Sequence, residues 1–463
     1  MTDKEQIEHL KGELSHALTR ISELEALLMK LSTVKNSKNS KNSKNSHKAP
    51  SSDLARKNQS LREKSDNPVG GQKGHKGNTL KMSPTPDVTE KIYPNFCNQC
   101  GGSLQVSTFE LAARRQVLDI PPIKPIITEY QSFGTQCGCG HYQCGIFPSG
   151  VVNHVQYGKN IQSLVVYQSY YQFLPFGRLQ DFFNKVCNVS IGKGTIENIL
   201  RRAAQKAQPA YDALKEAITE ATFVGSDETS FKSKGSKNWF WVWQNSLVTY
   251  LVAATSRSKA VIAEQFPCGL PNAILGSDRL AAQLSTTTKG NQACLPHLLR
   301  ELNYLIALEQ TPWAANFKTL LQAAIQLKQQ QPAYEKNNPQ TQFIEQRADQ
   351  LLLPDIARQL SSQPLLHKQT ITFFKGMLAI RHALFTCLYH SDVPFDNNGS
   401  ERAFRMVKVK TKISGQFKSL QHEFAVIRSV IDSAIKNGQS VFYAINAVID
   451  ITLDIIPPPK AAG

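Results

Sequence analysis

The sequence predicts a mixed α/β protein with several domains, and three observations support this class. The chain has 463 residues, which at about 150 residues per domain indicates roughly three domains. Short apolar runs at hairpin spacing predict strands within residues 222–278. Helical periodicity at 162–220, and a Leu-, Ala- and Gln-rich composition at 297–390, predict helices on both sides of these strands. An apolar share of 41% is sufficient for real cores and excludes a wholly disordered chain.

The charge balance of the chain is strongly basic. It contains 53 Lys and Arg against 36 Asp and Glu, a formal net charge of +17, and its isoelectric point is about 9.4. Such an excess indicates a polyanionic partner, with nucleic acid as the first candidate. There is no run of about 18 uncharged apolar residues, so we expect no transmembrane helix. Charged residues open the chain without an apolar signal segment, so we expect a cytoplasmic protein.

Residues 1–32 predict a coiled coil. Apolar residues recur there at alternating steps of three and four, which is the a/d pattern of a heptad repeat. They are Ile7, Leu10, Leu14, Ala17, Ile21, Leu24, Leu28 and Leu31. Nearly four unbroken heptads favour association between copies of the chain over an amphipathic helix packed on its own protein.

Residues 33–90 predict a basic, flexible linker. Lys-Asn-Ser repeats at 35–46 have too few apolar residues to order themselves. The excess of Lys and Arg in this segment would suit sequence-independent, salt-sensitive contact with phosphates. A merely solvated linker is an equally good interpretation of any single lysine.

Residues 91–150 predict a zinc-binding ribbon, because five of the nine cysteines lie close together here. Paired cysteines on short Gly-containing turns are ligands that tetrahedral Zn²⁺ prefers. We favour Cys97, Cys100, Cys137 and Cys139 as the ligands. The fourth position stays open among Cys139, His141 and Cys144, and unmetallated thiols are the alternative. Apolar runs at 116–122 and 126–133 predict the strands of the ribbon.

Residues 151–221 predict a helical DNA-binding region. A short amphipathic helix at 179–186, a turn at 187–191 and a second helix from Gly194 have helix-turn-helix spacing. The second helix would present polar and basic side chains to DNA. These are Lys193, Thr195, Asn198, Arg201 and Arg202. Helix pairs of this shape also occur in plain bundles, so the spacing alone does not decide.

Two predicted strands end on an acid within the same triplet, Gly-Ser-Asp. The acids are Asp227 and Asp278. A buried strand rarely carries an Asp at this place unless the carboxylate is paired or bound to metal. Adjacent strands that end in this way can place both carboxylates on one divalent cation. Alternation along the strand directs Glu228 to the opposite side from Asp227, so Glu228 is the weaker candidate.

A third acid, Glu401, opens a predicted basic helix. Its spacing allows two interpretations: a catalytic carboxylate, or the second half of a capping box with Asn398. Residues 401–420 contain six cationic side chains and no acid besides Glu401, which suits a phosphodiester substrate. The cations are Arg402, Arg405, Lys408, Lys410, Lys412 and Lys418.

The whole chain resembles the insertion sequence 66 family of transposases, which are bacterial mobile-element enzymes of the DDE class. Several motifs together carry this resemblance. They are the N-terminal zipper with Asn-Ser repeats ending at Pro50-Ser-Ser-Asp53, Gly70-Gly-Gln-Lys-Gly-His-Lys-Gly77, the paired cysteines around Val117-Leu-Asp-Ile-Pro-Pro122, Asp227-Glu-Thr before a Trp-rich strand, Cys294-Leu-Pro-His297-Leu-Leu-Arg-Glu-Leu302, and Asn397-Asn-Gly-Ser-Glu401-Arg-Ala-Phe-Arg405.

The resemblance implies an RNase H-like catalytic domain at 222–435 with a helical insertion at about 297–390, followed by a C-terminal helix and tail at 436–463. It also implies that Asp227, Asp278 and Glu401 form a catalytic triad that binds two Mg²⁺ (or Mn²⁺) ions, about 3.5–4 Å apart in sites of this kind. The supporting residues would be His297, Arg300 and Arg402. The basic helix adds Arg405 and Lys408 to the predicted DNA contacts.

The sequence departs from the family pattern at three places. Lys73 stands where Pro is common, and Leu295-Pro296 replaces the usual Trp-Ala. Arg279 follows Asp278 where the family commonly has Gly. A long cation beside the second acid would perturb metal binding, point away from the site, or contact DNA.

We therefore expect a transposase that cleaves and joins DNA ends by metal-dependent phosphoryl transfer. The expected partners are double-stranded DNA (terminal repeats and target), further copies of the chain through the coiled coil, and accessory proteins of the same element; the expected location is the bacterial nucleoid. One alternative is a non-catalytic DNA-binding protein with an inactivated core, which Arg279 alone supports. A second is a metal-dependent nuclease of the same fold.

Overall fold

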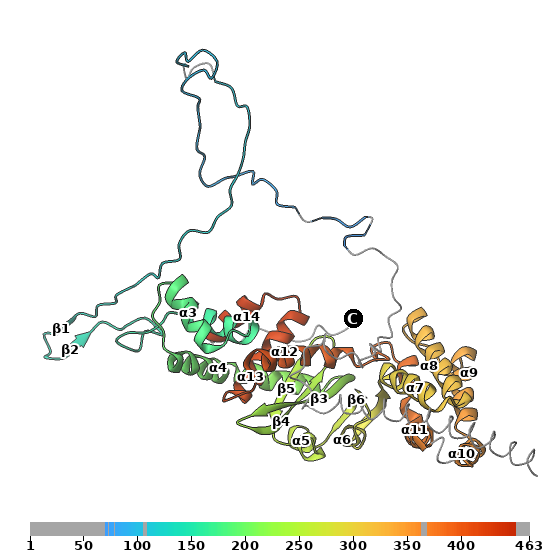
Figure 1. Cartoon of the computed structure of the whole chain (residues 1–463). Helices are drawn as coiled ribbons and strands as arrows, with labels where there is room; N and C mark the ends of the chain where they lie inside the picture. Colours follow the sequence, from blue (N-terminus) through green and yellow to red (C-terminus); the bar gives the residue numbers. More distant parts are fainter. Residues whose placement is uncertain (1–69, 73, 78, 105–108, 363–367, 451–463) are drawn as a thin grey trace, which may run out of the picture. The chain divides into compact units, whose positions relative to one another are not determined.

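The computed structural model in Figure 1 describes residues 70–450 except 73, 78, 105–108 and 363–367. The predicted coiled coil and most of the predicted linker lie outside these residues. The described residues form two compact units, one of 131–180 and 191–450 and the other of 70–130 and 181–190. Among the described helices none alone is long and apolar enough to cross a membrane, and one bent pair, Lys368–Ala379 with Arg381–Leu388, meets the length and composition criteria.

A five-stranded mixed sheet forms the centre of the larger unit. Its strands are β3 (Phe223–Ser233), β4 (Ser236–Gln244), β5 (Thr249–Ala254), β6 (Leu270–Ser277) and β7 (Thr288–Ala293). Their order across the sheet is β5-β4-β3-β6-β7; the first three are antiparallel, whereas β6 and β7 run parallel to β3. This arrangement confirms the predicted mixed α/β class and is compatible with an RNase H-like core.

The composition of the strands explains why this sheet forms. Aromatic residues fill β4, where Phe240, Trp241 and Trp243 are almost fully buried. Large aromatic side chains pack well on a pleated surface and bury much apolar area. The helix α6 (Ala281–Leu284) connects the parallel pair β6 and β7, because a parallel neighbour requires a crossover rather than a hairpin. The helix α5 (Lys259–Gln265) leads from the edge strand β5 to β6, which pairs in parallel with β3.

One group of helices consists of α2 (Lys159–Val166), α4 (Lys193–Thr219), α13 (Gln421–Lys436) and α14 (Val441–Asp450). α2 continues through a π-helical turn at Tyr167–Tyr171, and α3 (Phe176–Val186) follows. α4 packs against α13 and β5, and the Tyr211 hydroxyl donates a hydrogen bond to the Leu251 carbonyl. The predicted helices at 179–186 and from Gly194 therefore form as α3 and α4.

Between β7 and α12 (Asn398–Ser414) the chain is almost entirely helical. The helices are α7 (Leu295–Glu309), α8 (Pro312–Gln330), α9 (Pro339–Leu351), α10 (Pro354–Ser361) and α11 (Lys368–Ala379), followed by two 3₁₀ turns at Arg381–Ala383 and Thr386–Leu388. They gather beyond the β6–β7 edge of the sheet (Figure 1) and share one apolar core with Phe223, Ile274 and Ala293. The β3, β6 and β7 side of the sheet therefore packs against this helical group through a shared core.

The cysteine-containing segment has little regular structure in the described residues. A short hairpin pairs β1 (Gly134–Gln136) with β2 (Tyr142–Cys144). The strands that we predicted at 116–122 and 126–133 do not form, so that prediction was wrong. The side chains of Val117 and Ile126 are 92% and 93% exposed. A strand requires a partner with which to share its backbone hydrogen bonds, and alternation in the sequence cannot supply one.

Candidate active site

Asp227 and Asp278 lie at equivalent positions on the adjacent parallel strands β3 and β6. The pairing runs from Phe223 opposite Ile274 to Gly225 opposite Gly276. Continued in the same register by two residues, it brings Asp227 beside Asp278, just beyond the end of β6. Because parallel strands present equivalent residues to the same face, both carboxylates point to one side of the sheet. The prediction that the first of these strands ends at Asp227 was wrong, because β3 pairs with β4 as far as Ser233, whereas Asp278 directly follows the last residue of β6.

The Asp227 carboxyl group has an unusual electrostatic environment. Burial and then repulsion by the Asp278 carboxylate raise its pKa to about 8, and Glu228 and Glu401 add to this repulsion. Its Oδ1 accepts a hydrogen bond from the Glu228 amide, which opposes the increase. A buried acid surrounded by other acids is a poor anion by itself and a good ligand for a cation.

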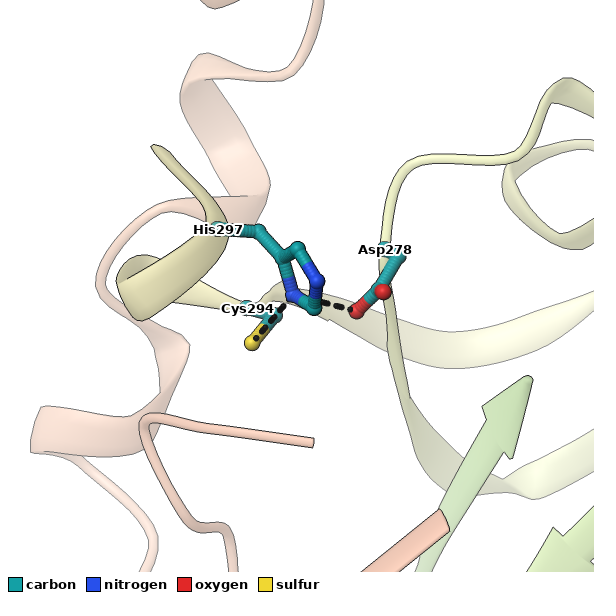
Figure 2. Close-up of side chains that lie close together, drawn as sticks. All are labelled: Asp278, Cys294 and His297. Carbon is teal, nitrogen blue, oxygen red and sulfur yellow. Dashed lines mark hydrogen bonds and ion pairs between the residues drawn. The ribbon is translucent and has the colours of Figure 1, made fainter. Parts of the chain in front are cut away.

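His297 links the second and third acids. It lies in the first turn of α7, which begins directly after β7. Its Nδ1 is 3.0 Å from Asp278 Oδ1, as Figure 2 shows, and its Nε2 is 3.7 Å from Glu401 Oε1. The imidazole therefore spans the space between the two carboxylates. Its predicted supporting position agrees with these distances.

Glu401 lies in the first turn of α12 and faces α7. Its Oε1 is also 3.6 Å from Arg300 Nη2. The capping interpretation was wrong: the N-cap residue of α12 is Asn397, without a side-chain cap bond. The Asn398 amide instead binds Asp396 Oδ1 at 3.0 Å. Glu401 is therefore free of a capping role and directs its carboxylate to the residues around Asp278.

Two further residues of this site were not identified from the sequence. The buried Asn397 side chain donates from Nδ2 to the Ser226 carbonyl at 2.9 Å and to Asp278 Oδ1 at 3.5 Å. The buried Cys294 Sγ lies 3.2 Å from His297 Nδ1 and accepts from the Asn397 amide at 3.3 Å. The three-residue step from Cys294 to His297 at the start of a helix is the signal that could have identified it.

Glu228 is turned away from the other acids, as alternation along β3 predicts. Its carboxylate pairs with Arg257, with 2.5 Å between Arg257 Nη2 and Glu228 Oε1, and its side chain is only 6% exposed. Gln283 contacts its second oxygen at 3.4 Å. Because arginine already neutralises its charge, Glu228 is a weaker candidate for a metal ligand than Asp227.

Arg279 also points away from the acids. Its Nη2 lies 2.5 Å from Glu301 Oε2 on α7, and its guanidinium lies over the Phe373 ring on α11. Its backbone φ is +69°, in the left-handed region that favours glycine. A glycine would adopt this backbone conformation without strain, whereas Arg279 adopts it while its side chain contacts Glu301 and Phe373.

The donor set of Asp227, Asp278 and Glu401 fits a hard divalent cation, because Mg²⁺ prefers carboxylate oxygens. Among the described residues, one group of three or more possible ligand atoms lies within 4.8 Å of one another, and it consists of Asp278, Cys294 and His297 (Figure 2). Asp227 and Glu401 are not in this tight group. They border it through the electrostatic and side-chain contacts described above.

The predicted DNA contacts are distributed over two helices. On α4, Lys193, Asn198 and Arg202 are exposed and Thr195 is partly buried. Arg201 is engaged within the protein, with Glu197 at 2.7 Å and Glu423 at 2.9 Å.

On α12, Arg405 and Lys408 are exposed. Arg402, which we predicted as a supporting residue, lines a separate cavity of about 1410 Å³ with residues of α4 and α13. That lining does not include Asp227, Asp278 or Glu401.

The predicted zinc ligands occupy two tight turns in different units. In one unit, the Cys97 carbonyl accepts from the Gly101 amide, and hydrogen bonds from Cys100 and nearby amides lower the pKa of the Cys97 thiol. In the other, the turn from Cys137 to His141 closes the β1–β2 hairpin, and Cys139 lowers the pKa of Cys137. Lowered pKa values favour the thiolates that bind metal. The four-ligand zinc site stays a prediction.

Comparison with known families places most of these elements in one match. The model of the Transposase IS66 family matches residues 154–423, which is more than half of the chain and includes the sheet, α7 and all of α12. The model of a family of unknown function (DUF6444) matches residues 3–81. A search of curated proteins found no match.

Proposed function

Because the chain belongs to the IS66 transposase family, we propose that it is a DDE transposase that cleaves and joins insertion-sequence ends by metal-dependent phosphoryl transfer. The observation that carries this proposal is the shared register of β3 and β6, which sets Asp227 beside Asp278 on one side of the sheet. Glu401 approaches the same side from α12 through His297 and Arg300. We infer that these three acids, remote in sequence, act together at one site.

Asp227, Asp278 and Glu401 would hold two Mg²⁺ or Mn²⁺ ions. Bound ions of this kind activate the attacking oxygen and stabilise the leaving one. The protein's own part is positioning and charge neutralisation, because phosphoryl transfer asks little covalent chemistry of side chains. His297 and Arg300 would orient Glu401, and Asn397 would orient Asp278 while tying β3 to the start of α12.

DNA would approach along the exposed cations of α12. Arg405 and Lys408 lie on the same helix as Glu401, one and two turns further on, so a phosphate backbone held there would run past the acids. Lys193, Thr195 and Asn198 on α4 would contribute contacts to the terminal repeats. Arg201 is the weakest of the predicted contacts, since two glutamates already neutralise it.

The N-terminal segment and the cysteine turns complete the proposal. The predicted coiled coil would hold two copies of the chain together, so that both ends of the element are held in one complex. Zn²⁺ is the further proposed cofactor, with Cys97, Cys100, Cys137 and Cys139 as its predicted ligands. Accessory proteins of the same element are the further candidate partners.

The decisive experiment measures cleavage of labelled element ends by the full-length protein with and without Mg²⁺. We expect Asp227→Asn, Asp278→Asn and Glu401→Gln each to abolish cleavage while DNA binding persists. Asp355→Asn is the matched control, because Asp355 is 82% exposed on α10 and remote from these acids in the fold. Cleavage that persists in any of the three variants would defeat the assignment of that acid.

A second assay separates transposase from nuclease. Pre-cut ends supplied with target DNA should be joined by the transposase, whereas a nuclease of the same fold cuts without joining. Mobilisation of a marked element in bacteria, wild type beside Asp278→Asn, tests the complete reaction. A wild-type protein that binds DNA but neither cuts nor joins it would favour the non-catalytic alternative.

A further inference from the structure

Asp278, Cys294 and His297 form a compact group of three different ligand types (Figure 2). Asp278 follows β6, Cys294 follows β7, and His297 lies one helical turn beyond Cys294 in α7. We propose that this group binds a thiophilic divalent cation such as Zn²⁺, in a manner distinct from Mg²⁺ binding by the three acids. The proposed ligands are the Asp278 carboxylate, the Cys294 thiolate and His297 Nδ1.

The distances within the group are close to those of a tetrahedral site. His297 Nδ1 is 3.2 Å from Cys294 Sγ and 3.0 Å from Asp278 Oδ1. With zinc–ligand bonds of about 2.0–2.3 Å, two ligands of a tetrahedral ion are about 3.3–3.6 Å apart. His297 Nδ1 would need to move away from each of the other two ligand atoms by only a few tenths of an ångström, and all three atoms already lie within 4.8 Å of one another. Three protein ligands leave a fourth position for water or a phosphate oxygen.

The groups around these ligands already have the partners that such a site requires. His297 Nε2 faces Glu401 Oε1 at 3.7 Å, an arrangement in which a carboxylate orients a metal-bound imidazole through its other nitrogen. The backbone N–H of Asn397 donates a hydrogen bond to Cys294 Sγ at 3.3 Å, and such a bond would stabilise a thiolate. A cysteine in a plain apolar core would have neither an imidazole beside its sulfur nor a backbone N–H that donates to it.

The chemistry of the ligands decides which ion fits. Thiolate and imidazole favour Zn²⁺ and related ions, whereas Mg²⁺ prefers oxygen ligands. The thiolate is the form of Cys294 that binds the ion, so binding must release the thiol proton to the solvent. The ion and Mg²⁺ would compete for Asp278. That consequence rests on the proposed function, whereas the binding itself does not.

Co²⁺ serves as the probe, because thiolate ligation gives it a charge-transfer absorption that oxygen ligands do not produce. Full-length protein, Cys294→Ser and Cys387→Ser are titrated with Co²⁺ in the absence of DNA and Mg²⁺. Cys387 is also a fully buried cysteine, and it has no part in the group, so it is the matched control. Ions held by the other cysteines contribute equally to all three proteins and cancel in the differences.

We expect Cys294→Ser to bind about one Co²⁺ fewer per chain than the parent and to lose the corresponding absorption, while Cys387→Ser matches the parent. If Cys294→Ser does not fold, His297→Ala at a partly exposed position gives the second test, with affinity at least about 10-fold lower, as for loss of even an outer partner. Equal Co²⁺ binding and absorption by the parent, Cys294→Ser and His297→Ala would overturn the proposal. Failure of DNA cleavage would not affect this result, because no DNA is present.

Discussion

Arg279 pairs with Glu301 on α7, with Nη2 and Oε2 2.5 Å apart, although its neighbour in the chain is Asp278. The cation that follows the second acid is therefore directed away from it. This removes the main observation in favour of an inactivated core. The backbone of Arg279 is strained, because this residue adopts a φ of +69°.

We expect Arg279→Gly to be more stable than Arg279→Ala by about 1 kcal/mol. Both variants lose the contacts with Glu301 and Phe373, so their difference isolates the left-handed backbone, which costs a non-glycine residue about 1–2 kcal/mol. Chemical denaturation of the two proteins measures this difference in the free energy of unfolding. Both should retain Mg²⁺-dependent cleavage; loss of cleavage in Arg279→Gly would mean that the guanidinium takes part in the reaction.

The stability of the metal-free protein should depend on the charge of Asp227. Its pKa is raised to about 8 in the folded state, so the folded protein keeps a proton that the unfolded chain releases near pH 4. Stability therefore decreases as the pH increases from about 4 to about 8.

Asp227→Asn removes this dependence and should be more stable than the wild type at pH 8, by at least about 1.4 kcal/mol, which corresponds to one pKa unit. The two should be equal near pH 4. Thermal unfolding in EDTA measures both, and added Mg²⁺ at pH 8 should stabilise the wild type more than the variant. A difference that does not change with pH would contradict the assigned environment.

Asn397 should be necessary for both stability and metal binding. Asn397→Ala leaves the Ser226 carbonyl and Asp278 without its amide donor, and a buried group that loses its partner costs about 1–3 kcal/mol. The Mg²⁺ concentration for half-maximal cleavage should rise about 10-fold. Asn398→Ala is the control, because Asn398 is exposed and binds only Asp396 among the described residues. Equal Mg²⁺ dependence of the two variants would argue against a role for Asn397.

Gly225 should not tolerate a side chain. A Cβ at this position would lie 2.5 Å from Gln244 Nε2 and 3.1–3.2 Å from atoms of Ser400 and Asn397, at the start of α12. Because Gln244 and Asn397 are buried, Gly225→Ala should displace α12 from β3 and cost about 1–3 kcal/mol, as overpacking of a core does.

Gly290→Ala in the same sheet is the matched control, since its nearest neighbour, Ile274 Cγ1, is 3.7 Å away. Denaturation midpoints and cleavage rates compare the two. A Gly225→Ala protein as stable and active as Gly290→Ala would show that Glu401 does not depend on this contact.

The α12 cations should determine the salt dependence of DNA binding. Each phosphate contact that is lost lowers the slope of log K against log salt by about 0.9. Arg405→Ala with Lys408→Ala should therefore lower it by about 2, whereas Arg358→Ala on α10 should leave it unchanged. Binding isotherms at several salt concentrations measure the slopes. An unchanged slope in the double variant would place the DNA elsewhere.

Local pattern was sufficient for several parts of this protein. Hairpin spacing and aromatic content predicted β4, and apolar runs that lead into Gly-Ser-Asp predicted β3 and β6, although only β6 ends at its acid and β3 continues beyond Asp227 to Ser233. These patterns belong to a few consecutive residues, and an apolar run of strand length that is buried on both faces favours a strand. The same reasoning failed at 116–122 and 126–133, because strand formation there depends on a partner that no local pattern specifies.

The sequence alone determined which side chains the protein has and, for several of them, the short helix or strand in which they lie. Only the fold decided their neighbours: that Asp227 meets Asp278, that His297 joins Asp278 to Glu401, and that Arg279 turns to Glu301. Cys294 and Asn397 became site residues in the same way. Parallel register and the docking of α12 on the sheet are contacts across long stretches of chain, and their energies come from packing and hydrogen bonds that no short segment contains.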